Sequence, residues 1–365
     1  MKSLLGRRLR QLREEAGLSQ SDLARSVGLS PEHIWNLEHG TRMPSLESLT
    51  RLADFFRKDV SFFLAEKEAA FSLLLKEKSL DRRLRSYLRN FKEYAEIYLR
   101  LEELTGQKAT PAPLYQTPSA TQLAREERQR LQLGTDPLAD VFSLLEINGL
   151  HLVRQALGKD SQIVGIFIFF DQEQAAFGLV NASLPEEDQA IIAAHLYGHY
   201  LKDRYAGPII DNSDIFLDYY LSLYHPREKF AQEFALSFLL PPTRLKECLQ
   251  REIKKPILHF EDILYLHRVF KISVKALLSL LYRQEVISPT RYKTFMKFNS
   301  DEGERLCFKN LFSLNKKRLK KGQIIHSDRF CHLVIEALRK KKLTTEEAAT
   351  LLQTNVNELA DWLAT

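Results

Sequence analysis

Apolar side chains recur every three or four positions along the first 64 residues, in short runs separated by glycines and by serines that can cap helices. Ser19 and Ser30 each precede such a run, and Gly17 and Gly28 end the runs before them. The five helices that this pattern predicts begin near Leu4, Gln20, Pro31, Leu46 and Phe62. A short glycine-containing turn between the second and third helix is typical of a helix-turn-helix. We therefore expect an all-α five-helix domain over residues 1–66.

Two segments of different pattern, one helical and one rich in proline, separate this domain from the part of the chain where strands are predicted. Residues 67–106 keep helical spacing with one apolar face, and residues 108–119 contain three prolines and no acidic group. We interpret residues 67–118 as a helical connector that ends in a proline-containing linker. The apolar face of the connector could hold two protomers together or pack against the downstream domain.

The middle of the chain, residues 119–298, mixes helical patterns with runs of β-branched and aromatic residues. These runs predict strands at 150–153, 163–170 and 175–180. The helices expected here are 120–133, 136–148, one that begins at Pro185, 216–224, 227–240, 260–270 and 273–282. Residues 299–365 predict a basic, helical C-terminal module, whose end (343–362) loosely repeats the pattern of 18–37 with caps at Thr344 and Asn355. The fold class is therefore mainly α with a small β-sheet, that is, α+β.

Composition narrows the class of protein. The chain has 365 residues, of which 44% are hydrophobic and 27% charged, as in an ordinary globular protein. The start of the chain has no run typical of a signal peptide, and no stretch approaches a membrane span. Cys248, Cys307 and Cys331 lack the spacing of a cysteine zinc site or a disulfide framework. We expect a cytoplasmic protein that does not contact membranes.

The net charge of +6 is concentrated near the end of the chain. Residues 301–342 contain 12 Lys or Arg against 5 Asp or Glu, so the surplus lies in this stretch. The runs 316–321 and 339–342 could attract phosphates or acidic partners, or could simply form a solvated basic face.

The residues from Leu18 to Ser45 carry a strong local signature. The string LSQSDLARSVGLSPEHIWNLEHGTRMPS closely resembles the XRE (lambda-repressor-like) helix-turn-helix family. That resemblance implies that the third helix enters the DNA major groove. A single unit of this size buries modest DNA area, so we expect a homodimer on a two-fold operator. The residues that it places on double-stranded DNA are Gln20, Ser30, Pro31, Glu32, His33, Trp35, Asn36 and Arg42. Asn36 could read adenine and Glu32 could accept from cytosine, while Gln20 and Arg42 would contact phosphates. The alternatives are a domain kept only for packing or dimerisation, and a Trp35 that belongs to the edge of the core.

A second signature is the string His195-Leu-Tyr-Gly-His199. Two histidines at positions i and i+4 of a helix lie about 40° apart, so both imidazoles can reach one cation. Zinc peptidases carry H-E-x-x-H, where the glutamate accepts a proton from the metal-bound water. Leu196 stands in that place and cannot accept a proton. Taken alone, the pair is more typical of two hydrogen-bonded core histidines.

The downstream string EKFAQEFALSFLLPP, which begins at Glu228, resembles the second motif of ImmA/IrrE-type metallopeptidases. The resemblance extends from about 122 to 290 and implies a zincin-like α+β domain. It also implies that His195, His199 and Glu228 occupy the three metal-ligand positions, with Leu196 at the position of the general base. Zinc, held by three protein ligands with one open position, is the metal implied.

The missing glutamate argues against catalysis. A positioned general base contributes roughly 10²- to 10⁴-fold to such reactions. Glu233 or Glu187 could replace it, although Glu233 lies about 140° around the helix from Glu228. His225 and Asp203 are further ligand candidates.

Three functions fit these observations. The first, which we favour, is a DNA-binding transcriptional regulator whose degenerate ImmA/IrrE-like domain senses a ligand, metal or partner protein. The second is an active zinc metallopeptidase that cleaves a repressor. The third is a non-catalytic interaction protein of a toxin–antitoxin or phage-response module, with a peptide or protein held in the cleft.

Overall fold

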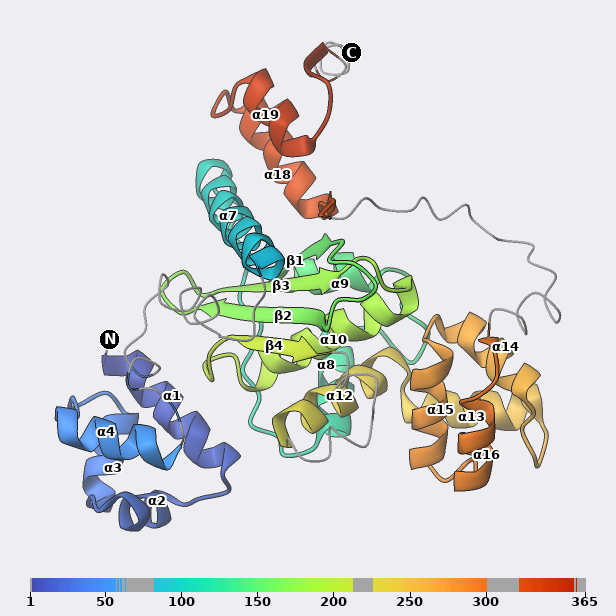
Figure 1. Ribbon diagram of the computed structural model, residues 1–365, viewed down its shortest axis with the longest axis horizontal. Coiled ribbons are helices and arrows are strands. Elements are labelled where there is room, and N and C mark those ends of the chain that lie inside the picture. Colours follow the sequence, from blue (N-terminus) through green and yellow to red (C-terminus); the bar gives the residue numbers. More distant parts are fainter. Residues whose placement is uncertain are drawn as a thin grey trace.

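The computed structural model describes residues 2–56, 58, 60, 63, 82–212, 226–300, 322–357 and 359. Its N-terminal helices, coloured blue in Figure 1, are α1 (Lys2–Glu15), α2 (Gln20–Val27), α3 (Pro31–Glu38) and α4 (Leu46–Phe55). They enclose a core of their own that includes Leu9, Leu23 and Ile34. The expected fifth helix near Phe62 lies mostly outside the described residues.

The boundaries of α2 and α3 follow from their caps. The Ser19 hydroxyl accepts a hydrogen bond from the Asp22 backbone N–H, and the Asp22 carboxylate accepts from the Ser19 N–H, which forms a capping box. Gly28 ends α2 with φ = 67°, a left-handed conformation that glycine adopts without strain. Ser30 caps α3, and its hydroxyl accepts from the His33 N–H.

The second half of the molecule is built on a five-stranded sheet with the order β4-β2-β3-β1-β5 (Figure 1). Its strands are β1 (Leu150–Gln155), β2 (Ile163–Phe170), β3 (Ala175–Asn181), β4 (Ile209–Asn212) and β5 (Ile324–Ile325). Strands β1 and β3 are parallel, and the other pairs are antiparallel. The fold is therefore α+β, as expected, and the three central strands lie where the sequence predicted them.

Helices cover both faces of this sheet (Figure 1). On one face, α9 (Val141–Ile147) and α10 (Glu186–Lys202) share a core with Phe167, and α8 (Ala120–Arg130) and α12 (Pro226–Leu239) pack outside α10. On the other face, α7 (Arg82–Thr105), α18 (Asp328–Arg339) and α19 (Thr345–Leu352) share a core with Ile168. The α7 and α18 segments come from the expected connector and C-terminal module. The sheet and its two helical layers thus form one packed unit across the boundaries expected at 118/119 and 298/299.

A helical subdomain follows α12. It contains α13 (Pro242–Cys248), a π-helical turn (Leu249–Ile253), α14 (Phe260–Phe270), α15 (Val274–Arg283) and α16 (Pro289–Phe295). Leu264, Leu277 and Leu281 of this subdomain join the core that contains α10.

Several details differ from the sequence-based expectations. The helix expected from Asp136 begins at Val141, because the Asp140 side chain caps it by accepting from the Ser143 N–H. The Asp136 carbonyl instead accepts a hydrogen bond from Arg128. Strands β4 and β5 and helices α13, α16 and α18 were not predicted. The expected helix 216–224, the basic run 316–321 and most of the last helix after Asn355 lie outside the described residues.

The proline-containing segment before α8 is irregular but is held against α10. The Ala112 N–H donates to the Tyr200 hydroxyl, and the Tyr115 N–H donates to the Leu201 carbonyl. Arg204 donates to the carbonyls of Ala112 and Pro113. These contacts fix the chain on its way into the sheet unit.

One ion pair connects the N-terminal helices with the sheet unit. Arg7 of α1 donates to both carboxylate oxygens of Asp171, in the turn between β2 and β3, at 2.6 Å each. Its guanidinium also lies over the Tyr205 ring, 4.7 Å from the ring centre. Among the described residues, no helix is both long enough and apolar enough to cross a membrane.

Candidate functional site

Helix α3 presents a polar, exposed face on a buried support. Ile34 and Leu37 are fully buried and anchor the helix to the N-terminal core. Of the residues expected on DNA, Ser30, Pro31, Glu32, Trp35 and Arg42 are exposed, and Gln20, His33 and Asn36 are half-buried. The structure thus brings the predicted residues from Ser30 to Asn36 together at the start of α3 and along it, whereas Gln20 begins α2 and Arg42 follows α3.

Two of these side chains are oriented by neighbours. The Trp35 ring stacks on His39, with ring centres 4.1 Å apart, and remains 45% exposed. Trp35 therefore lies on the surface of the domain, outside its core. The Asn36 side-chain oxygen accepts a hydrogen bond of 2.7 Å from the Thr41 hydroxyl. This contact holds the carboxamide beside the exposed face of α3.

Gln20 belongs to a buried network behind α3. Its amide donates to Glu38 at 2.8 Å, and Glu38 also accepts two hydrogen bonds from Arg13, at 2.6 and 3.0 Å. Arg13 donates in addition to the Leu18 carbonyl. The network ties α1, α2 and α3 together, which fixes the angle between the two helices of the helix-turn-helix.

The second site is a cluster of four potential metal ligands: His195 and His199 of α10, Glu228 of α12 and Asp211 of β4. The two histidine Nε2 atoms lie 3.2 Å apart, and Glu228 Oε2 lies 3.2 Å from the first and 3.5 Å from the second. Asp211 Oδ2 lies 3.4 Å from His195 Nε2. One ligand atom from each residue can be chosen so that all four lie within 4.8 Å of one another.

The sequence predicted three of these residues but missed Asp211. The signal was weak, because β4 has only four residues and its partner β2 lies over forty positions earlier in the chain. A glycine within an apolar strand often marks a close approach of another group. A Cβ at Gly165 of β2 would lie 2.8 Å from Ile192 and 3.3 Å from Asp211 Oδ2. Gly165 was therefore the residue that could have indicated a side chain in this place.

A second glycine lets the two ligand-bearing helices approach. A Cβ at Gly198 of α10 would lie 3.0 Å from Phe234 and 3.2 Å from the Ala231 backbone, both on α12. The absence of that atom places Glu228 at the start of α12 beside the histidine pair.

Asp203 is hydrogen-bonded to one histidine of the cluster and is not a member of it. Its carboxylate lies 2.9 Å from His199 Nδ1 and also accepts from Arg227. A carboxylate at Nδ1 fixes the tautomer and leaves Nε2 available for a cation, as is usual for metal-binding histidines. This pattern favours the metal interpretation over a pair of structural core histidines. His225, the other spare ligand candidate, lies outside the described residues.

The electrostatics of the cluster demand positive charge. Burial alone would lower the pKa of His195, but Asp211 and Glu228 raise it to about 9. Burial is likewise outweighed at His199, where Asp203 and Glu228 raise the pKa to about 10. For Glu228, burial would raise the pKa, yet the two histidines hold it well below its ordinary value. A bound cation or protonated imidazoles can supply the charge that these buried carboxylates require.

Leu196 lies in the core between α10 and the sheet. It is fully buried, and its two methyl groups lie over Gly165 and Gly178 of adjacent strands. Neither expected substitute for the missing base joins the cluster. Glu233 forms an ion pair with Arg283, and Glu187 lies two helical turns before His195, roughly 12 Å along the axis.

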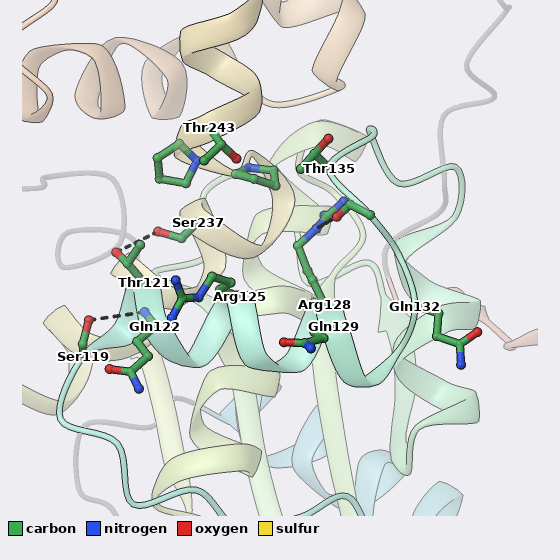
Figure 2. A pocket seen from close by; sticks show the side chains of 13 residues that line it. Ser119, Thr121, Gln122, Arg125, Arg128, Gln129, Gln132, Thr135, Ser237 and Thr243 are labelled. Carbon is green, nitrogen blue, oxygen red and sulfur yellow. Dashed lines mark hydrogen bonds between the residues drawn. The ribbon is translucent and has the colours of Figure 1, made fainter.

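A separate cavity of about 730 Å³ lies between α8 and the junction of α12 with α13 (Figure 2). The Thr121 and Ser237 hydroxyls lie 3.3 Å apart on its wall. The Arg128 side chain donates to the carbonyls of Gly134, Asp136 and Phe238, which shapes the cavity but occupies the guanidinium. Ser237 lies near the opposite end of α12 from Glu228, so this cavity is distinct from the cluster.

Comparison with known proteins identifies the N-terminal unit. Residues 4–60 match the family described as a helix-turn-helix domain, and the chain therefore carries an N-terminal helix-turn-helix DNA-binding domain, as predicted. A segment of 83 residues is 36% identical to the HTH-type transcriptional regulator RamB of two Mycobacterium tuberculosis strains, CDC 1551 / Oshkosh and ATCC 25618 / H37Rv. The match covers 23% of this chain and only 18% of each relative.

Among solved structures, the Bacillus thuringiensis PlcR complex with the peptide PapR7 and DNA aligns with 99% of this chain and 96% of its own. The sequence identity is 14% and the TM-score is 0.20, which is too low to indicate a common arrangement of the two chains.

Proposed function

We propose that this protein is a transcriptional regulator that binds operator DNA through α3 and senses a metal ion, ligand or partner through a non-catalytic ImmA/IrrE-like domain. The observation that carries the proposal is the contrast between an exposed, well-capped α3 and a ligand cluster on α10 without its base. Two copies would bind a two-fold operator, since a single domain of this size covers little DNA.

The DNA-binding part is tested by selection from a random-sequence duplex library with the full-length protein at moderate salt. We expect enrichment of one motif with two-fold symmetry. Asn36→Ala should weaken binding to the selected duplex by 10- to 100-fold and relax the base preference at one position. Arg42→Ala should weaken binding to all sequences alike and reduce the salt dependence by about one unit.

Arg125→Ala is the matched control, because Arg125 is an exposed arginine on α8 beside the cavity of Figure 2. It should leave DNA binding unchanged. Failure to enrich any sequence would contradict the proposal and favour a helix-turn-helix kept only for packing or dimerisation.

In the sensing part, zinc is the ion that the donor set fits best. Two imidazoles disfavour Ca²⁺ and Mg²⁺, which prefer oxygen ligands, and mixed imidazole and carboxylate sites are common for Zn²⁺. His195, His199 and Glu228 would hold the ion, and Asp203 would orient His199. When bound, zinc would supply positive charge to the buried Asp211 and the partly buried Glu228.

The second candidate function is a metallopeptidase that cleaves a repressor, which the arrangement of two histidines and Glu228 favours. Incubation of the purified protein with candidate repressors, with and without a chelator, decides between the two. Chelator-sensitive cleavage that is lost in His199→Ala would support the peptidase. A stable, uncleaved partner that co-purifies with the protein would support the third function, an interaction module.

A further inference from the structure

Asp211 is buried and directed at the ligand cluster from the edge of the sheet. Asp211 is 4% exposed, and its Oδ2 atom accepts no hydrogen bond from the described part of the chain. The nearest ring nitrogen of the cluster is His195 Nε2, at 3.4 Å. A buried carboxylate oxygen without a donor costs free energy unless a positive charge completes it.

The strand that carries Asp211 is shaped for this placement. The register of β2 against β4 shifts between Ile163 and Gly165, opposite Asp211 and Asn212. A bulge of this kind re-aims a side chain, and such bulges are frequent next to functional sites. The missing Cβ at Gly165 leaves room for the carboxylate between β2 and α10.

The distances within the cluster match those of a tetrahedral site. In a zinc site with bonds of about 2.0–2.1 Å, neighbouring ligand atoms lie about 3.3 Å apart. The three contacts among His195, His199 and Glu228 measure 3.2, 3.2 and 3.5 Å, and the contact of Asp211 with His195 measures 3.4 Å. The remaining separations reach up to 4.8 Å, so Asp211 on the edge strand would move about 1.5 Å toward the other ligands when the ion binds.

We propose that Asp211 is the fourth ligand of a zinc ion and closes the coordination sphere that a peptidase would leave open for water. The proposal rests on the metal-binding part of the proposed function. Four protein ligands are typical of structural zinc sites, whereas catalytic sites keep three and an exchangeable position. The ion would connect α10, α12 and β4, so that its occupancy controls how firmly the edge strand is held.

The experiment uses the full-length protein loaded with Co²⁺, whose visible absorption reports coordination number. The wild type should show intense tetrahedral bands that acetate or azide does not change. Asp211→Ala should bind the ion at least 100-fold more weakly, as measured by competition with a chromophoric chelator. Acetate should shift its bands by filling the vacated position.

Asp211→Asn is the second variant, since it keeps the shape of the side chain and protects the test against a folding defect. It should also lose affinity, with a far-ultraviolet circular dichroism spectrum like that of the wild type. Asp188→Asn is the matched control, a half-buried carboxylate on the same α10 helix. It should bind Co²⁺ as tightly as the wild type and show the same bands.

Two outcomes would overturn the proposal. Wild-type bands that respond to azide, together with unchanged affinity in Asp211→Ala, would show three protein ligands and an open position, with Asp211 standing beside a bound water. In that case Asp211 would be placed to act as the substitute base, and the peptidase function would be favoured. Absence of Co²⁺ and Zn²⁺ binding in the wild type would also overturn it. Selection of operator DNA is measured separately, so either outcome can be told apart from failure of the regulator itself.

Discussion

Helices α3 and α10 carry the predicted DNA-contacting side chains and the histidines of the ligand cluster, and they hold them in opposite ways. Helix α3 has eight residues, of which Ile34, Leu37 and Glu38 are buried, and its polar side chains face solvent. Helix α10 has seventeen residues, and every residue from Ile191 to Leu201 is buried. A DNA-contacting surface needs only exposed groups on a stable support. A metal cluster needs groups from several elements that meet inside the protein, and their positions depend on the whole fold.

Of the tests of this comparison, we expect the largest change in stability from the loss of a histidine ligand on α10. If the cluster binds zinc, saturation at 1,000-fold over Kd should stabilise the folded protein by about 4 kcal/mol. His195→Ala should abolish the zinc-dependent rise in melting temperature and reduce bound zinc from about one per chain to none. His332→Ala, at an exposed histidine on α18, should keep both. An equal zinc response in all three proteins would place the ion elsewhere.

The next effect concerns the support of α3. Glu38 is the buried acceptor for Arg13 and Gln20, and its side chain is 1% exposed. Glu38→Ala should therefore lower the free energy of unfolding of the N-terminal domain by about 3 kcal/mol, because it leaves the Arg13 guanidinium buried without its partner. Chemical denaturation followed by Trp35 fluorescence measures the loss. Glu47→Ala, which removes an exposed partner of Arg51 outside this network, should cost less than 1 kcal/mol. Equal losses in the two variants would refute the role given to the network.

A third prediction concerns the stability contribution of Glu146, a buried carboxyl group outside α3 and α10. Burial raises the pKa of Glu146 to about 7, even though Ser327 and Tyr98 donate to its carboxylate. Between pH 4.5 and 7, Glu146 is therefore protonated in the folded protein and ionised in the unfolded chain. The free energy of unfolding falls as the pH rises through this window. Glu146→Gln should raise stability by about 2 kcal/mol at pH 8 and change it little at pH 4.5. Melting temperatures across this pH range measure the difference, and a pH-independent effect would contradict the prediction.

The smallest effect concerns the contact between the two units. Arg7 and Asp171 form an ion pair with side-chain exposures of 38% and 15%, so we expect a coupling of about 0.5–1 kcal/mol. A double-mutant cycle with Arg7→Ala and Asp171→Ala measures it through the unfolding free energy. The coupling should shrink in 0.5 M salt. A coupling near zero at low salt would show that the two units unfold independently of this contact.

The sequence predicted what depends on neighbouring residues. The caps Ser19 and Ser30 and the terminating Gly28 lie within a few residues of the helices that they bound, so local rules found them. Strands β1 to β3 were found because their apolar runs are continuous and end in turn residues. Residues His195, His199 and Glu228 were found because two short motifs mark them.

The remainder depends on contacts between distant segments. Nothing local to Ile209–Asn212 indicates that it pairs with β2, so Asp211 was not connected with the histidines. The apolar face of α7 was recognised, and packing against the downstream domain was one of its two expected uses, but the sequence did not indicate which face of the sheet it covers. The helix expected from Asp136 begins at Val141, where Asp140 caps it, and the Asp136 carbonyl accepts a hydrogen bond from Arg128, a contact that no local pattern reveals.

The position of Leu196 limits which side chains this place in α10 can accept. Leu196 is fully buried, its methyl groups contact two glycines of the sheet, and Asp211 lies near one of them, Gly165. A glutamate introduced at 196 would bring a carboxylate into this buried layer, at a cost of several kcal/mol unless a donor or a cation paired with it. Folding alone therefore disfavours an acid at position 196, whatever reaction that acid could serve.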